Sequence, residues 1–224
     1  MAAEQKAAAV GQGTGPATGY RLLLPSQWAQ IPLRRGTDEA IERILQDAYA
    51  RIPADAPRDK IGPYKQELAR RFRKAVAGAQ EHKGLDLYLP VRPVGDDDFN
   101  LGASILVAET VLPVRDSSAS QTPPSEIAVQ LLTRDGAGEA DLSSGEVDGA
   151  LAVRREHVAA AAPDKGLVAA SRRVEYIVSV PEDPDRWFIA AFSTIGGGDP
   201  RDELSEALVE WFDAVMATFR WRRG

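Results

Sequence analysis

The sequence predicts an α+β fold built on a mostly antiparallel sheet. Stretches with the two-residue period of strands, such as 171–183 and 186–195, follow one another through short turns rather than crossover helices, and short connections make neighbouring strands antiparallel. Helical period appears in separate blocks, two near the N-terminus and one at the C-terminus. That grouping is typical of α+β layers rather than of alternating βαβ units.

The N-terminal half is predicted to hold a tail, a strand, two helices and a second strand. Residues 1–19 contain little to bury, so we expect a disordered tail followed by one domain over 20–224. Trp28, Ile31 and Leu33 are assigned to a connection. The expected elements are a strand at 20–25, a helix at 37–52 with Thr37 as N-cap, a helix from Pro63 to just before Gly84, and a half-buried strand at 85–91.

The C-terminal half is predicted to be rich in strands and to end in a helix. Residues 126–134 fit a short helix or a strand, with the helix favoured, and 134–146 are expected to form a loop. The last helix is the clearest element, because apolar residues from Leu204 to Phe219 recur at helical spacing. The expected strands are 101–114, 147–160, 171–183 and 186–195, which brings the sheet to about six strands.

Composition excludes several classes of function. The formal net charge of -6 argues against a broad nucleic-acid surface, and the absence of cysteine excludes disulfides, thiolate nucleophiles and zinc sites with cysteine ligands. No segment approaches the roughly 18 uninterrupted apolar residues of a membrane span, and the N-terminal residues do not form a signal peptide. We therefore expect no membrane insertion and a cytoplasmic protein, of bacterial origin by its amino-acid usage.

The glycines in FSTIGGGDPRDEL, residues 192–204, could belong to a phosphate-binding loop or to a turn that starts a helix. Neither the spacing of a P-loop nor that of a dinucleotide fingerprint is present. Asp199, Asp202 and Glu203 already place carboxylates at the positive end of the following helix, where they would repel phosphate. We interpret the stretch as a turn, with Asp199 as N-cap and Pro200 in the first helical position.

No metal site, cofactor site or catalytic motif is predicted. Asp96 to Asp98 in GDDDFN lack the ligand pattern of a calcium loop and fit a solvated turn. His82 is expected to cap a helix C-terminus, and His157 lies near the end of a strand. Neither histidine belongs to HExxH-type spacing, and no GxSxG elbow supplies a serine nucleophile.

One basic run is the candidate binding surface. Arg70, Arg71, Arg73 and Lys74 fall on the side of the second helix away from its apolar residues. Such a run is a solvated helical face or a surface for an acidic partner. The arginines of RWRRG at the C-terminus are expected to complement the dipole of the last helix.

The C-terminal part resembles the PsbP-like superfamily, which includes the LpqN-type proteins of actinobacteria. The resemblance rests on RWFIAAFSTI followed by DELSEALVEWFDAVMATFRW, and on the strand pair GALAVRREH and VEYIVSVP, within residues 145–221. It implies an α/β/α sandwich with helices on both faces of the sheet and no shared active site. Members serve as photosystem accessory proteins, as regulators that bind a small GTPase, or as envelope lipoproteins. LpqN-type proteins carry a signal peptide and a lipidated cysteine, which this chain lacks.

These observations favour a non-catalytic accessory or interaction protein that acts on an unidentified protein partner, with Arg70, Arg71, Arg73 and Lys74 as the partner-binding residues. The process is open, with an envelope or secretion role implied by the resemblance alone. The alternative is an enzyme or small-ligand-binding domain with a pocket between sheet and helices, in which His157 with nearby carboxylates is the candidate group. A third hypothesis, nucleic-acid binding through the second helix, is disfavoured by the acidic balance.

Overall fold

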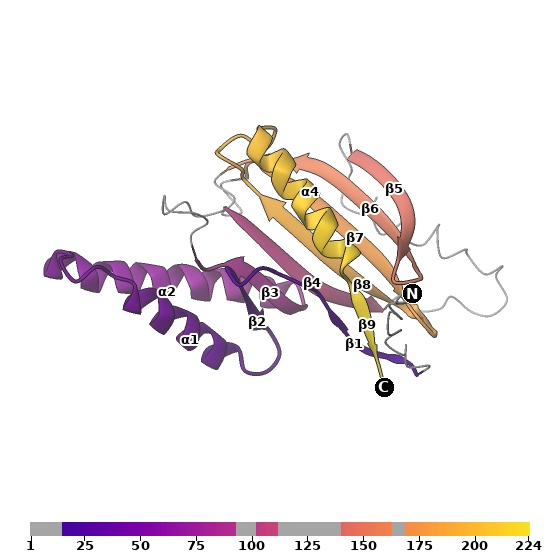
Figure 1. Cartoon of the computed structure of the whole chain (residues 1–224), viewed down its shortest axis with the longest axis horizontal. Coiled ribbons are helices and arrows are strands. Elements are labelled where there is room, and N and C mark those ends of the chain that lie inside the picture. The colour runs from indigo at the N-terminus through magenta and orange to yellow at the C-terminus, as the bar shows by residue number, and fades with distance from the viewer. Residues whose placement is uncertain (1–14, 93–101, 112–139, 163–168) are drawn as a thin grey trace, which may run out of the picture.

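The computed structural model describes residues 15–92, 102–111, 140–162 and 169–224. Figure 1 shows how its elements are arranged. In chain order they are β1 (Ala17–Arg21), β2 (Trp28–Pro32), α1 (Thr37–Ala50), α2 (Arg58–Glu81), β3 (Gly84–Pro90), β4 (Ala103–Val111), β5 (Ala140–Val147), β6 (Ala150–Ala159), β7 (Ser171–Val180), β8 (Asp183–Thr194), α4 (Glu203–Ala217) and β9 (Arg220–Arg223). The segments 126–134 and 96–98, for which a helix or strand and a turn were predicted, lie outside these residues.

The described strands form one large sheet and one small one. The large sheet has seven strands in the order β2-β3-β4-β8-β7-β6-β5, and every neighbouring pair is antiparallel. β1 and β9, from opposite ends of the chain, form a separate antiparallel pair. The predicted α+β class with a mostly antiparallel sheet is confirmed, with seven strands in the main sheet where about six were expected.

Helix α4 packs on one face of the main sheet and buries the larger core (Figure 1). Phe212 is fully buried, and its ring stacks on Phe192 of β8 with 5.0 Å between centroids. Trp211 stacks on Trp28 of the edge strand β2 at 4.8 Å. Each such aromatic pair contributes about 0.5–1.5 kcal/mol beyond its buried area. The C-terminal helix is therefore joined to both the centre and the β2 edge of the sheet.

Helices α1 and α2 form a helical hairpin on the opposite face, at the β2–β3 end. Side chains of consecutive strand residues point to opposite faces. Tyr88 of β3 accordingly belongs to the core beneath α4, whereas Leu87 packs with Ile41 and Ile44 of α1 in a second core. β3 is thus buried on both faces rather than half-buried as predicted. The far part of the hairpin projects beyond the sheet (Figure 1).

The prediction that the second helix starts at Pro63 is wrong, because α2 begins at Arg58. Pro57 precedes the helix, and its carbonyl accepts the first turn's hydrogen bond from the Lys60 N–H at 3.0 Å. Pro63 lies inside the helix and costs it one backbone hydrogen bond near the N-terminal end. The first residues of α2 are exposed and charged, so they carry no apolar period from which the true start could be predicted.

The prediction of a loop over 134–146 is wrong for its second half, because Ala140–Val147 is strand β5. It forms a hairpin with β6 through the two-residue turn Asp148-Gly149. Both turn residues are left-handed, with φ of 48° and 74°, as a type I′ turn requires. The turn and the backbone ladder define this strand, because its side chains from Asp141 to Glu146 are all exposed.

The structure also corrects both ends of the domain. β1 starts at Ala17, inside the segment 1–19 that was predicted to be a tail, and β2 includes Trp28 and Ile31, which were assigned to a connection. The last helix stops at Ala217, and Arg220–Arg223 forms strand β9. Arg220 still donates from Nη1 to the carbonyl oxygen of Ala217 at 3.1 Å, so it interacts with the C-terminus of the helix as predicted. The alternation of β9 buries Trp221 and leaves Arg220 and Arg222 exposed.

Candidate functional site

The four predicted partner-binding residues lie close together on α2, and all four side chains are exposed. Their surroundings differ, however. Arg70 and Arg71 are paired with an acidic neighbour on the same helix, and Arg70 and Arg73 line a pocket between α1 and α2. Lys74 is exposed and lines neither of the two pockets described below.

Glu67 holds the guanidinium groups of Arg70 and Arg71. Arg70 donates from Nε and Nη2 to the two carboxylate oxygens, at 2.8 Å each, and Arg71 donates from Nε at 2.7 Å. These hydrogen bonds, with that of Arg70 the largest cause, lower the pKa of Glu67 to about 2. Glu67 therefore stays ionised at any physiological pH, and one carboxylate offsets part of the charge of two arginines.

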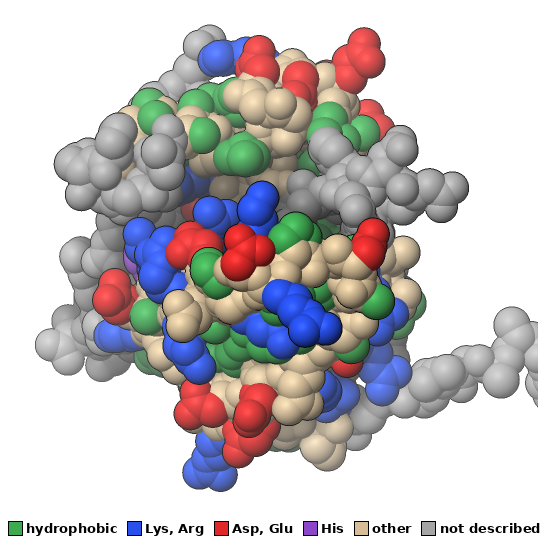
Figure 2. Space-filling model, turned by 90° about the vertical axis from the view of Figure 1, so that its left-hand side faces the viewer, with side chains coloured by type: hydrophobic (Ala, Val, Ile, Leu, Met, Phe, Trp, Pro, Cys, Tyr) green, Lys and Arg blue, Asp and Glu red, His purple; other side chains and the backbone are tan. Residues whose placement is uncertain are grey.

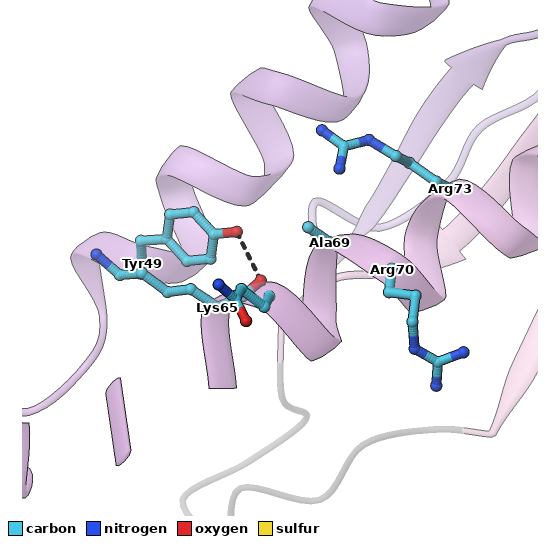
Figure 3. A pocket seen from close by; sticks show the side chains of 6 residues that line it. Tyr49, Lys65, Ala69, Arg70 and Arg73 are labelled. Atoms are coloured by element: carbon cyan, nitrogen blue, oxygen red, sulfur yellow. Dashed lines mark hydrogen bonds between the residues drawn. The ribbon is translucent and has the colours of Figure 1, made fainter. Parts of the chain in front are cut away.

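A pocket of about 420 Å³ lies between the two helices of the hairpin, and Figure 3 shows the side chains around it. Tyr49 comes from α1, whereas Lys65, Ala69, Arg70 and Arg73 come from α2. The Tyr49 hydroxyl donates to the Lys65 carbonyl at 3.0 Å, and the Lys65 ammonium lies 4.8 Å from the centre of the Tyr49 ring. The lining is mostly apolar, so the pocket combines an apolar floor with cationic groups at its rim.

A second pocket of about 460 Å³ lies where α1 begins, beside the C-terminal part of α2. Its lining is mostly polar and includes Arg34, Arg35, Arg73 and the carboxylates Asp38 and Glu39. The chain turns sharply into α1 here. Gly36 is the N-cap of the helix and has a left-handed backbone, with φ of 76°. Because glycine has no side chain, it offers no side-chain acceptor to the first N–H groups of α1. This turn holds Arg34 and Arg35 just before the helix, on the side that faces α2.

Arg73 is common to both pockets, so the two form one surface along the hairpin. We call this surface the hairpin groove and define it by Arg34, Arg35, Tyr49, Lys65, Ala69, Arg70 and Arg73. Figure 2 looks at the side on which the hairpin projects, and Lys and Arg side chains gather across the middle of this face with Asp and Glu beside them. The groove thus offers separated positive charges rather than one continuous basic stripe.

Sequence reasoning found Arg70 and Arg73 but missed the residues that α1 and its preceding turn contribute. Tyr49 packs against the second core from the apolar face of α1 and also borders the pocket. Arg34 and Arg35 lie three and two residues before the start of α1, and an Arg-Arg-Gly before a helix is the signal that could have drawn attention to them. Their meeting with Arg73 depends on how α1 lies against α2, which no local pattern contains.

The two histidines lie away from the hairpin groove. His82 is the C-cap of α2, as predicted, and its Nδ1 lies 2.7 Å from the carbonyl oxygen of Gly78. His157 is half-buried on β6, opposite Ala140 of β5 and Arg173 of β7. Neither of the two pockets above includes it. A catalytic or ligand-binding role for His157 stays a prediction.

The glycine stretch is a turn that starts α4, but its cap is Asp202 rather than the predicted Asp199. The Asp202 carboxylate accepts hydrogen bonds from the backbone N–H groups of Ser205, at 2.6 Å, and Gly197, at 2.7 Å. These bonds, with that from Ser205 the largest cause, lower the pKa of Asp202. Asp199 instead accepts from the Arg201 N–H at 2.9 Å, inside the turn. The protein's own carboxylate therefore occupies the place that a phosphate would need.

The described residues contain neither a metal-ion cluster nor a membrane-spanning helix. No three His, Asp or Glu side chains in the described ranges are grouped closely enough to hold a metal ion. None of the helices within the same ranges is long and apolar enough to cross a membrane. The expected cytoplasmic location and the absence of enzyme activity stay predictions.

Comparison with known proteins gives a distant structural likeness. No protein-family model matches the chain, and no curated protein matches its sequence. The fold is similar to the crystal structure of LpqN, a protein involved in cell envelope biogenesis of Mycobacterium tuberculosis, with 10% identity and a TM-score of 0.45. That match covers 92% of this chain and 84% of LpqN. Membership of the PsbP-like superfamily stays a prediction.

Proposed function

We propose that the protein is a non-catalytic interaction protein whose hairpin groove binds an acidic, partly apolar segment of a protein partner. The observation that carries the proposal is the position of Arg73, which lines both an apolar pocket and a polar, arginine-containing pocket. A partner segment lying along the hairpin would place an apolar side chain against Tyr49 and Ala69. Its next carboxylates would then reach Arg73 and the Arg34–Arg35 pair.

The chemistry of the groove favours carboxylate ligands. An arginine fork matches the two oxygens of a carboxylate, and the charge-assisted bonds that form are stronger than neutral ones. An apolar side chain that fills the Tyr49–Ala69 pocket adds about 25 cal/mol for each Å² of apolar area removed from water. Both terms are available to one peptide, because Arg70 and Arg73 stand at the rim of the apolar pocket.

The distribution of acidic residues favours a protein ligand over nucleic acid. Glu67 lies between Arg70 and Arg71, and Asp38 and Glu39 line the second pocket. A nucleic-acid backbone carries a charge at every residue and would bring phosphates against these carboxylates. A peptide, by contrast, can carry acidic side chains at the positions that face the arginines and uncharged side chains at the positions that face Glu67, Asp38 and Glu39. The net charge of -6 opposes the polyanion further.

The test is a binding titration with defined probes. A labelled twelve-residue peptide that alternates Asp or Glu with Leu or Phe is titrated with the protein and followed by fluorescence anisotropy. Arg73→Glu is expected to weaken binding about tenfold or more, which corresponds to about 1.4 kcal/mol. Lys74→Glu is the matched control, since it reverses one charge on the neighbouring residue outside both pockets. It is expected to weaken binding less than about threefold.

Four further results decide between the hypotheses. Replacement of the peptide's Asp and Glu by Asn and Gln should weaken binding, and replacement of its Leu and Phe by Ser should weaken it too, because both pockets are filled. Equal losses for Arg73→Glu and Lys74→Glu would show general charge attraction and contradict the proposal. A single-stranded oligonucleotide of equal charge that binds more tightly than the peptide would contradict it in favour of nucleic acid.

A further inference from the structure

The outer edge of β5 is a second exposed surface with a distinct chemistry. Among the described strands, β5 ends the seven-strand sheet and pairs only with β6. Residues 141–146 are all exposed, and among the described residues only β6 pairs with this strand. Leu142 keeps 46% of its surface exposed. Backbone N–H and C=O groups that point away from β6 are therefore free to pair with another strand.

The opposite edge of the sheet is built differently. β2 has five residues, lies close after Pro25 and ends at Pro32, and its Trp28 and Ile31 are buried. Short length and proline are the usual protection of an edge strand against added strands. β5 has eight residues in continuous register with β6, no proline and no lysine. The two edges thus differ in the features that control strand addition.

We propose that the open edge of β5 binds an extended basic segment of a partner protein by strand addition. The side chains of β5 include two carboxylates, Asp141 and Glu146, and no cation. Because their sequence positions differ in parity, they point to opposite faces of the sheet. A strand added beside β5 is therefore recognised by Lys or Arg on both of its faces, with an apolar side chain next to Leu142.

Charge also argues against a second copy of this chain as the occupant. Pairing β5 with β5 of another molecule would bring four carboxylates into one two-stranded ribbon that has no cation of its own. Like charges close together across strands are destabilising. Asp141 lies directly opposite Glu156 of β6, but Arg154 and Arg172 already pair with Glu156, so the carboxylates of β5 itself are the charges that an added strand meets. The same carboxylates that exclude a second copy select a basic strand.

The probe is a ten-residue peptide of Lys, Thr and Val that presents Lys on both faces when it is extended. The control is the same peptide with every Lys replaced by Glu. Binding is measured by titration calorimetry and located by amide hydrogen exchange. The Lys peptide is expected to bind at least tenfold more tightly than the Glu peptide and to slow exchange in β5. The double variant Asp141→Asn with Glu146→Gln should weaken binding at least fivefold. Neutralising the exposed Glu81 and Glu210 instead should leave binding unchanged.

A pair of proline variants tests strand addition itself. Successive N–H groups of a strand point to opposite edges, so one of Ser143→Pro and Ser144→Pro removes a group that faces the open edge, and the other removes one that pairs with β6. The variant that loses the N–H facing the open edge is expected to keep the melting temperature of the unaltered protein but to lose peptide binding. Full binding by both variants, or no binding by the unaltered protein, would overturn the proposal. Concentration-dependent dimers in sedimentation equilibrium that either proline abolishes would overturn it in favour of a second copy. Because none of these variants touches the hairpin groove, the result is independent of the function proposed there.

Discussion

Arg154 of β6 donates two hydrogen bonds to Asp213 of α4, from Nε to Oδ1 and from Nη2 to Oδ2, each at 2.9 Å. The Tyr176 hydroxyl donates a third bond to Asp213 Oδ1, also at 2.9 Å. Burial, together with this bond to a carboxylate, raises the pKa of Tyr176. One carboxylate on the helix thus joins α4 to two adjacent strands, at the border of an otherwise aromatic interface.

Loss of this carboxylate should destabilise the protein. Asp213→Ala is expected to lower the free energy of unfolding by about 1.5–3 kcal/mol, because the half-buried Arg154 and Tyr176 lose a charged acceptor. The measurement is urea denaturation followed by tryptophan fluorescence. Glu210→Ala, at an exposed position of the same helix, should stay within about 0.5 kcal/mol. A similar loss for both variants would mean that the ion pair is not the cause.

A second carboxylate of the same cluster should make stability depend on acid pH. Burial alone would raise the pKa of Glu156, but hydrogen bonds from Arg154 and Arg172 outweigh it and lower the pKa below the ordinary value of 4.5. A lowered folded-state pKa stabilises the protein above the unfolded pKa, and this stabilisation is lost as the pH falls through the folded value. The free energies of unfolding of the unaltered protein and of Glu156→Gln are measured by urea denaturation from pH 7 to pH 3. The unaltered protein should be the more stable of the two at pH 7, and the difference between them should become smaller below about pH 4.5. A difference that does not change with pH would contradict this cause.

The two candidate caps of α4 can be separated by mutation. Asp202→Ala removes the acceptor for the Ser205 and Gly197 N–H groups and should lower the melting temperature by about 2–4 °C. Asp199→Ala removes a single bond within an exposed turn and should lower it less. The comparison is made by thermal denaturation at neutral pH. A larger effect at Asp199 would restore the cap that the sequence predicted.

Glu67 should moderate binding at the hairpin groove. Glu67→Gln removes the charge that holds Arg70 and Arg71, so both guanidinium groups become available to an acidic peptide. We expect severalfold tighter binding of the acidic probe, with a steeper dependence on salt because more cations contribute. Anisotropy titrations at two salt concentrations measure both effects. Unchanged or weaker binding would show that Arg70 acts only in its present, paired position.

The sequence was most informative where one local pattern determines an element. The apolar period from Leu204 to Phe219 located the last helix, because a helix that covers a sheet must present an apolar face. The pattern failed for β5, whose polar and exposed residues carry no strand period. That strand depends on pairing with β6 and on the Asp148-Gly149 turn, a dipeptide that is itself a hairpin signal.

The candidate site shows the same division. Arg70 and Arg73 could be found from the sequence because they lie in one basic run. The contributions of Arg34 and Tyr49 could not, because they reach Arg73 only through the packing of α1 against α2. The pairing of Glu67 with two arginines follows from helical spacing, which puts residues three and four apart on neighbouring positions.

A charge-swap titration at Arg73 decides whether the hairpin groove recognises carboxylates. The affinities of the unaltered protein and of Arg73→Glu are measured for the acidic peptide. They are also measured for a series of peptides in each of which a different single acidic residue is changed to Lys. If Arg73 contacts one carboxylate of the peptide directly, the peptide with Lys at that position should bind Arg73→Glu more tightly than it binds the unaltered protein. The coupling energy at that position should be at least about 1 kcal/mol. Additive losses at every position, with no restored pair, would contradict the proposal that Arg73 binds an acidic partner segment.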